Sequence, residues 1–127
     1  MFKPCLHLII LALWSTVGLA QTDSLTRFFY PDGTLSSEGI LKDGKPDGFW
    51  KTYHPNGKLK SEGNRVNGEL EGQWVFYSED GIKSLELGYA EGKKDGVQKK
   101  YHETGVLKSM EFFVQDVKVC GSPCEPP

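Results

Sequence analysis

Aromatic and glycine positions recur along this chain at a fixed step of 24 residues. An aromatic residue opens each repeat, and the four members are Phe29, Tyr53, Tyr77 and Tyr101. Four residues after each of them comes a glycine, and these are Gly33, Gly57, Gly81 and Gly105. Tryptophan follows in the first two repeats, at Trp50 and Trp74. Such strict spacing indicates one small structural unit used about four times.

The polar stretches between the hydrophobic runs contain turn signals. Pro31-Asp32-Gly33 and Pro55-Asn56-Gly57 are tight-turn sequences, because proline presets φ and Asn-Gly or Asp-Gly supplies a positive φ cheaply. A second turn is expected around Gly44–Gly48. The runs between turns are about four to eight residues long, which suits strands rather than helices. We therefore predict an all-β fold, an elongated antiparallel meander in which each 24-residue unit is one β-hairpin.

Two glycines fall inside predicted strands, at Gly39 and Gly63. A glycine in a strand marks a bulge or a close approach by a neighbouring group, so we expect a Trp or Tyr from the next strand to lie over each. The third unit has Gln98 in place of the tryptophan and Leu87 in place of the glycine. The joint loss of both residues agrees with that pairing.

One stretch of the second unit carries a family resemblance. It runs Tyr53-His-Pro-Asn-Gly57-Lys-Leu-Lys-Ser-Glu-Gly63, followed by Gly68, Gly72 and Trp74. This pattern resembles the bacterial variant of the MORN repeat, best known from the YwqK family of antitoxins, and it covers about Phe29 to Val114. The resemblance implies a train of β-hairpins that binds or scaffolds protein or lipid. It supplies no catalytic residue set.

The chain begins with the features of a secretory signal. Lys3 precedes an apolar run, Leu6 to Trp14, and Gly18-Leu19-Ala20 is a small-x-small cleavage site. We expect cleavage near Ala20 and export to the periplasm, the cell envelope or the medium, with an uncleaved anchor as the alternative. The predicted divisions are a signal peptide at 1–20, an N-terminal capping segment at 21–28, a repeat domain at 29–116 and a tail at 117–127.

The tail contains the two cysteines that remain after signal cleavage, Cys120 and Cys124. Two cysteines in an exported chain suggest a disulfide, which would close a small ring and stabilise little else. A redox-active pair is the alternative, although the spacing is C-x3-C and not C-x-x-C. No metal site is expected, because two thiols are too few ligands and no histidine lies near them in the sequence.

Charge argues against nucleic acid as a partner. The full chain has 15 basic and 17 acidic residues, a net charge of −2, and no concentrated basic face. The last third is locally basic through Lys93, Lys94, Lys99, Lys100 and Lys108. These lysines form either a solvated strand face or a site for an acidic partner or anionic head groups.

Catalysis is not expected. His54 and His102 occupy the same place in two repeats, which explains them as turn residues, and no nucleophile–base set, phosphate loop or metal cluster is present. No cofactor is implied by the sequence.

The function predicted is binding of a protein partner, and a toxin-like partner is the version that the YwqK resemblance implies. One sheet face should bury Leu35, Leu59 and Leu107. The candidate partner-binding or repeat-defining aromatics are Trp50, Tyr53, Trp74, Tyr77 and Tyr101. Alternatives are a glycan or cell-wall module that stacks sugars on these rings, an anionic-lipid module, and a structural envelope role. Open sheet edges would also allow a homodimer.

Overall fold

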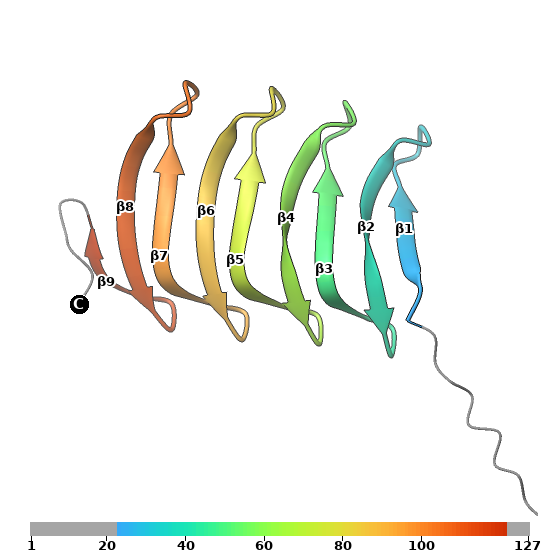
Figure 1. Ribbon diagram of the computed structural model, residues 1–127, viewed down its shortest axis with the longest axis horizontal. Helices are drawn as coiled ribbons and strands as arrows, with labels where there is room; N and C mark the ends of the chain where they lie inside the picture. The colour runs from blue at the N-terminus through green and yellow to red at the C-terminus, as the bar shows by residue number, and fades with distance from the viewer. Residues whose placement is uncertain (1–22, 122–127) are drawn as a thin grey trace, which may run out of the picture.

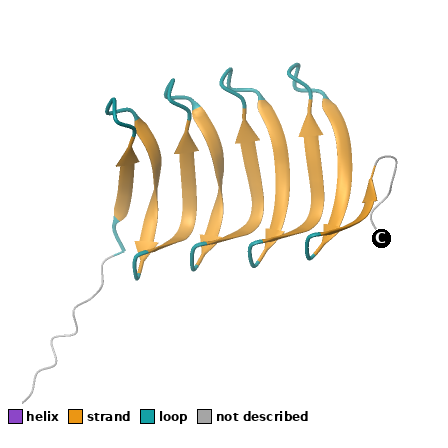
Figure 2. Cartoon of the chain, turned by 180° about the vertical axis from the view of Figure 1, so that it is seen from behind, coloured by secondary structure: helices purple, strands orange, loops and turns teal. Residues whose placement is uncertain are grey.

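A single antiparallel sheet of nine strands makes up the structure, a computed structural model that describes residues 23–121 (Figure 1). The strands follow one another in chain order, as the predicted meander requires. They are β1 (Leu25–Phe29), β2 (Leu35–Lys42), β3 (Lys45–Tyr53), β4 (Leu59–Val66), β5 (Glu69–Tyr77), β6 (Lys83–Ala90), β7 (Lys93–Tyr101), β8 (Leu107–Val114) and β9 (Val117–Gly121). Figure 2 shows only strands and loops in this part of the chain, so the all-β prediction is confirmed.

Tight turns close each hairpin at one end of the sheet. In the first, the Gly33 amide donates to the Tyr30 carbonyl at 2.9 Å, and Gly57 donates to His54 in the same way at 2.8 Å. The turn glycines have φ near +85°, a value that other residues rarely adopt. The sequence Pro-Asp/Asn-Gly therefore forms the turns that it predicts.

The turns at the other end differ from the prediction. They are two-residue turns at Asp43-Gly44, Asn67-Gly68, Glu91-Gly92 and Gln115-Asp116, where both residues have positive φ, as type I′ turns require. The expected turn over Gly44–Gly48 was therefore placed too broadly, because Lys45 already begins β3. Gly48, with φ of +81°, instead lies inside that strand and bends it.

The bend comes from a bulge. Glu38 pairs with Lys51 and Ile40 with Asp47, so Gly39 alone stands opposite three residues of β3. The same shift recurs in the next two repeats, between Glu62 and Asn64 and between Leu87 and Tyr89. Extra residues on one strand bend it and increase its twist.

A tryptophan fills the inside of this bend. The Trp50 indole lies directly on Gly39, where a Cβ would collide with the ring, and Trp74 lies on Gly63 in the same way. The Trp50 Nε1 donates to the Ile40 carbonyl at 3.1 Å, and the Trp74 Nε1 donates to the Asn64 carbonyl at 2.9 Å. The expected packing of an aromatic ring over each strand glycine is confirmed.

These two indoles form the core. Between residues 23 and 121 the buried hydrophobic side chains are Trp50, 5% exposed, and Trp74, 2% exposed. The sheet is one layer thick, and no second sheet or helix among the described residues covers either face. The tryptophans escape solvent only because the glycine of the preceding strand allows them to lie against its backbone.

In the third repeat, Gln98 and Leu87 replace the tryptophan and the glycine, and the glutamine keeps the hydrogen bond that the indole makes. Gln98 is 3% exposed, and its Nε2 donates to the Gly88 carbonyl at 3.0 Å, the bond that the indole makes in the first two repeats. Leu87 pairs with Gln98 and supplies side-chain volume where Gly39 and Gly63 have none. The Gln98 Oε1 is buried without a hydrogen-bond partner, so this repeat is the less complete one.

The sheet is wider than the predicted repeat domain of 29–116. All of strand β1 except Phe29 lies in the segment predicted as an N-terminal cap, and β9 lies in the predicted tail. One expected core position is wrong, since Leu107 is 47% exposed. Its strand pairs with β9 only over Glu111–Val114, so no further repeat covers Leu107 among the described residues.

Replacing Gly63 by alanine should test the indole–glycine contact. We expect Gly63→Ala to lower the free energy of unfolding by about 2 kcal/mol, because the added methyl collides with the Trp74 ring. In a Trp74→Gln background, which imitates the third repeat, the same change should cost less than about 1 kcal/mol. Urea unfolding measures all four corners of this cycle.

The neighbouring exposed Asn64 provides the control, and Asn64→Ala should change stability by less than about 0.5 kcal/mol. Equal costs of Gly63→Ala in the two backgrounds would contradict the contact.

Candidate binding surface

A row of charged residues crosses one face of the sheet. Direct cross-strand pairs join Arg27 to Glu38, Glu38 to Lys51, and Lys51 to Glu62. The row continues through Val75, Glu86, Lys99 and Met110. Directly opposed residues point to the same side of a sheet, so the row marks one face, here called the charged face.

Hydrogen bonds and ion pairs order the acids of this row. The Arg27 Nε lies 3.1 Å from Glu38 Oε2, and the Tyr53 hydroxyl donates to Glu38 Oε1 at 2.7 Å. The Tyr77 hydroxyl donates to Glu62 Oε1 at 3.1 Å. The tyrosine column therefore binds the glutamate column of the preceding hairpin, and each contact joins two consecutive repeats.

These contacts shift the ionisation of both partners. The hydrogen bond from Tyr53, together with Arg27, holds the pKa of Glu38 below its usual value. Burial, with the bond to Glu38, raises the pKa of Tyr53 to about 12. Burial and Glu62 raise the pKa of Tyr77, and burial and Glu86 raise that of Tyr101. Lys83 lowers the pKa of Glu86.

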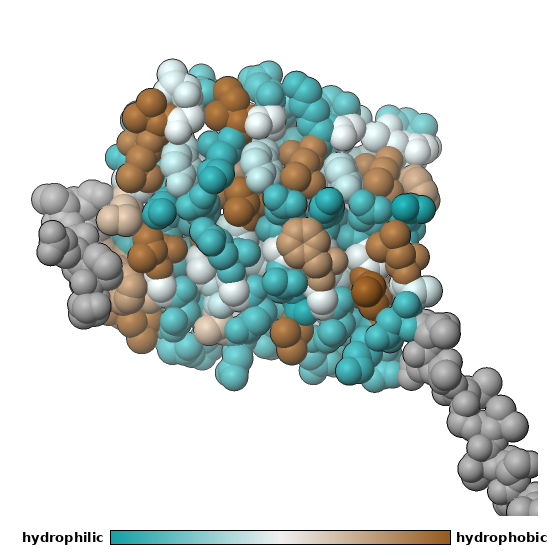
Figure 3. All heavy atoms as spheres, in the orientation of Figure 1, coloured by the Kyte–Doolittle hydropathy of each residue, from teal (hydrophilic) through white to brown (hydrophobic). Residues whose placement is uncertain are grey.

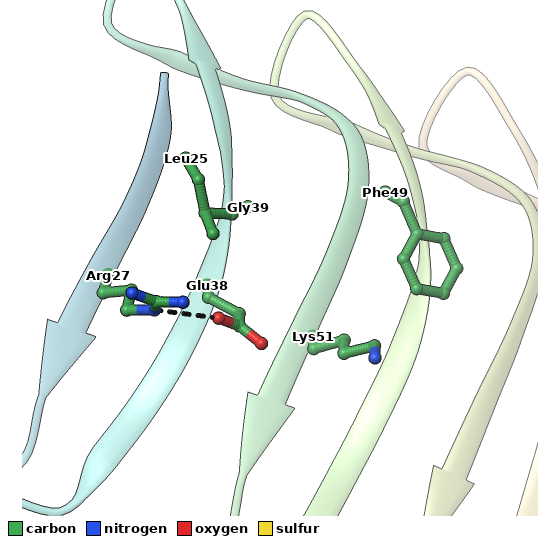
Figure 4. Close-up of a pocket in the computed structure, with 6 residues that line it drawn as sticks. All are labelled: Leu25, Arg27, Glu38, Gly39, Phe49 and Lys51. Carbon is green, nitrogen blue, oxygen red and sulfur yellow. Dashed lines mark hydrogen bonds and ion pairs between the residues drawn. The ribbon is translucent and has the colours of Figure 1, made fainter. Parts of the chain in front are cut away.

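A shallow hollow lies at the β1–β3 end of the charged face (Figure 4). Its volume is about 270 Å³, and its walls are Leu25, Arg27, Glu38, Gly39, Phe49 and Lys51. Figure 4 shows the Arg27–Glu38 ion pair below Leu25, with Lys51 and Phe49 beyond Glu38. Leu25 and Phe49 are 55% and 50% exposed, and both lie on the same side of the charged row, so apolar surface adjoins the ion pair.

The candidate aromatics divide into two groups. Trp50 and Trp74 are buried on glycines and cannot meet a ligand without unfolding the bend. Tyr53, Tyr77 and Tyr101 are half-buried on the charged face. The five rings do not form one exposed row, and this removes the two indole platforms on which the sugar-stacking alternative depends.

The hollow has only a weak signal in the sequence. Phe49 stands in the same repeat position as Leu25, Gln73 and Val97, a column with no common chemistry. Its place directly before Trp50 was the available signal, because alternation puts neighbours on opposite faces. With Trp50 packed inside the bend, Phe49 must point outward.

The lysines of the last third do not make one patch. Lys99 and Lys100 are neighbours in β7 and so point to opposite faces. Lys99 lies 3.6 Å from Glu86 in the charged row, while the Lys94 ammonium lies 5.2 Å from the Phe113 ring centre. Of the two interpretations of these lysines, a solvated strand face agrees better with this separation.

His54 lies at the start of a tight turn, and its side chain has a structural role there. The His54 Nε2 lies 2.8 Å from the Tyr77 carbonyl, and the Asn56 Nδ2 donates to the Glu79 carbonyl at 2.9 Å, so both side chains join one turn to the next. Among residues 23–121 no group of three or more His, Cys, Asp or Glu side chains could hold a metal ion. No helix in that range is long and apolar enough to cross a membrane.

Other predictions concern residues at the ends of the chain. Cys120 lies in β9 opposite Phe112, but Cys124 is outside the described residues, so the disulfide stays a prediction. The signal peptide at 1–20 also lies outside them.

Comparison with known proteins identifies the repeat. The MORN repeat variant matches residues 46–67 and 94–115. These segments cover two of the hairpins described above, β3–β4 and β7–β8, 48 residues or two repeat steps apart. MORN repeats are generally non-catalytic modules that bind protein or membrane. A search of curated proteins found no match.

Stability should fall at both ends of the pH scale. Glu38 and Glu86 have lowered pKa values, so their contribution is present above the usual value of 4.5 and disappears as the pH falls through the folded-state value. The raised pKa of Tyr53 acts in the opposite sense, and its contribution disappears as the pH rises from 10.0 towards about 12. Urea midpoints measured across the pH range test both limbs.

Tyr53→Phe keeps the ring and removes the ionisable hydroxyl, so it should reduce the alkaline loss. An alkaline limb of unchanged steepness in this variant would assign the effect to other groups.

Proposed function

We propose that this chain is an exported, non-catalytic module that binds a protein partner on the charged face, with the hollow between Leu25 and Phe49 as the contact centre. The observation that carries the proposal is the exposure of apolar side chains around an ordered ion pair on a sheet of one layer. The MORN repeat matches support a binding role of this kind.

The hollow has the composition of a protein-binding centre. Such centres combine aromatic or aliphatic anchors with arginine and are surrounded by polar residues. Here Phe49 and Leu25 are the anchors, Arg27 is already paired with Glu38, and the charged row extends away from them across the sheet. Figure 3 shows that hydrophobic residues on the visible face are interspersed with hydrophilic ones.

The shape of the sheet suits recognition without rearrangement. Hydrogen bonds join neighbouring repeats at both ends of the sheet. They include the Tyr30 hydroxyl to the Tyr53 carbonyl at 2.7 Å and the Gly68 amide to the Pro46 carbonyl at 2.7 Å. A surface held in this way loses little conformational entropy when a partner docks. We therefore expect the partner to be a folded protein. Its surface should present an apolar protrusion that fits the hollow and charges of both signs opposite the charged face.

The finer form of the proposal concerns the partner's class. A YwqK-like role would make the partner a toxin, and export through the predicted signal would place the encounter in the cell envelope. The chain would then act as an immunity protein against a toxin that arrives or works there. Finding the mature chain in the cytoplasm would remove the premise of this form and leave the binding proposal intact.

A second candidate is contact with anionic membrane. It is favoured by one observation at the other end of the sheet, where Val114, Val117 and Val119 are 46%, 63% and 51% exposed beside Lys118. Sedimentation with anionic liposomes at low salt tests it, because attraction to head groups is strongest when screening is weak.

The protein-binding proposal predicts a specific role for Phe49. Crosslinking of the tagged chain in its native cells, followed by mass spectrometry, identifies the partner, and binding is then measured with the purified pair. Phe49→Ala should weaken binding by at least about tenfold, the loss typical of a central anchor. Its effect on stability should be small, because half of the ring is already in water.

Val106→Ala is the matched control. Val106 is 63% exposed in a distant turn, so its loss should leave affinity unchanged. Equal affinity of wild type and Phe49→Ala would dismiss the hollow as the contact centre. Retention by liposomes with no protein partner would favour the membrane alternative.

A further inference from the structure

Each interior odd-numbered strand has two halves that pair with different neighbours. In β3, Lys45 and Pro46 pair only with β2, whereas Gly48–Tyr53 pairs with β4. Lys51 and Thr52 in that later half also pair with β2, through Glu38 and Ser37. A later half therefore normally lies between two even-numbered strands.

The two outer strands correspond to opposite halves of this unit. Strand β1, Leu25–Phe29, is 24 residues before Phe49–Tyr53 and so represents the later half. The residues before it, Asp23 and Ser24, are not in a strand. Strand β9, Val117–Gly121, is 48 residues after Glu69–Gln73. Its residues Val117–Val119 represent the first half, and Cys120 and Gly121 extend two positions into the later half, opposite Phe112 and Glu111. Figure 1 shows both outer strands as short arrows at opposite ends of the sheet.

We propose that the chain associates with itself head to tail, with β1 of a second copy pairing beside the first half of β8. This goes beyond the proposed partner binding, since it uses the sheet edges rather than the charged face. Strand β9 pairs with β8 from Glu111 onward. The earlier part, Leu107–Ser109, pairs with β7 and with no other strand of residues 23–121. In the repeat, Leu25 is equivalent to Gly121, so the part of β1 of the second copy that can fill that place is Thr26–Phe29.

The repeat fixes the register of this junction. Within the chain, one equivalent residue pair joins each even-numbered strand to the odd-numbered strand that follows it. These pairs are Ser37–Thr52, Ser61–Phe76 and Leu85–Lys100, and each is 24 residues further along than the one before. The next even member is Ser109, and the odd member that precedes Thr52 by 24 residues is Phe28. The junction therefore places Ser109 of one copy opposite Phe28 of the second copy.

The turns would extend across the same junction. His54 reaches the Tyr77 carbonyl of the following turn at 2.8 Å. The residue 48 positions after His54 is also a histidine, His102. The residue 48 positions before Tyr77 is Phe29, whose carbonyl is therefore the equivalent acceptor. His102 of the first copy would then meet the Phe29 carbonyl of the second, continuing the contact already present inside the chain.

Exposed apolar side chains lie on both sides of the proposed junction. Phe28 and Phe29 on β1 are 46% and 59% exposed, and Val106 and Leu107 at the start of β8 are 63% and 47% exposed. Residues 122–127 would be the competing occupant of the β8 edge. Three of the six are proline, which has no amide hydrogen for a strand ladder, so they are poorly suited to fill it.

Such a contact uses different surfaces on the two copies, so it does not close at a dimer. It is small, and the association should be weak and dependent on concentration. In sedimentation velocity of the mature chain, we expect the weight-average mass to keep rising with concentration past the dimer value. A constant monomer mass, or a plateau at the dimer, would overturn the proposal.

A charge at the centre of the junction should block it. Phe28→Lys should weaken self-association by about tenfold or more, while Phe49→Lys, at similar exposure on an interior strand, should leave it unchanged. Because Phe28→Lys keeps its β8 edge, adding it to wild type should shorten the wild-type oligomers. Circular dichroism confirms that both variants fold. Equal effects of the two variants, or no shortening, would overturn the head-to-tail arrangement.

A second measurement does not depend on disrupting the fold. A photoreactive benzoylphenylalanine at position 28, in a mixture of isotope-labelled and unlabelled chains, should crosslink between copies to the peptide that contains Ser109. The same group at position 49 should not. Crosslinks from position 28 that join only residues of one chain, including its own 122–127 segment, would refute the junction.

Discussion

The contact of an indole with the bare backbone of the preceding strand is the constraint on which this structure depends. A sheet of one layer has water on both sides, so almost no side chain can be desolvated by packing against a second layer. The bulge at Gly39 bends the strand, and the missing side chain makes room for the Trp50 ring inside the bend. Exposed positions on both faces remain available for recognition because the core needs so little of the sequence.

Polar contacts between consecutive repeats complete what the tryptophans begin. Carboxylates at Asp47, Glu71 and Asp95 each accept the backbone amide of a turn 20 residues later. Tyrosine–glutamate pairs join the same neighbours on the charged face. Each repeat therefore contacts only the one before and the one after, which is the arrangement of a quasi-one-dimensional array.

Most of the fold could be predicted from the sequence, because the period sets the hairpin and the glycines mark the turns. The Gly39–Trp50 pairing was also accessible, since the third repeat loses both members together. The type I′ turns were misplaced because Lys45–Gly48 looks like a turn, whereas its glycine serves the bulge. The hollow could not be located from the sequence, because alternation puts Phe49 on the opposite face from Trp50 but does not say which face curves inward. Leu107 was wrongly placed in the core because its position in the period says nothing about the missing neighbour.

The Gln98–Leu87 substitution has a consequence for the cooperativity of the molecule. In an array of nearest-neighbour contacts, the weakest junction decides where partial opening begins. Among the three bulged junctions, β2–β3, β4–β5 and β6–β7, only β6–β7 lacks an indole, and it leaves the Gln98 Oε1 unsatisfied, so it is the weakest of the three. Amide hydrogens of β7 to β9 should then exchange as one unit, ahead of those in β1 to β6. The chain thus consists of a firmly held segment that carries the hollow and a more readily released one that carries the C-terminal edge.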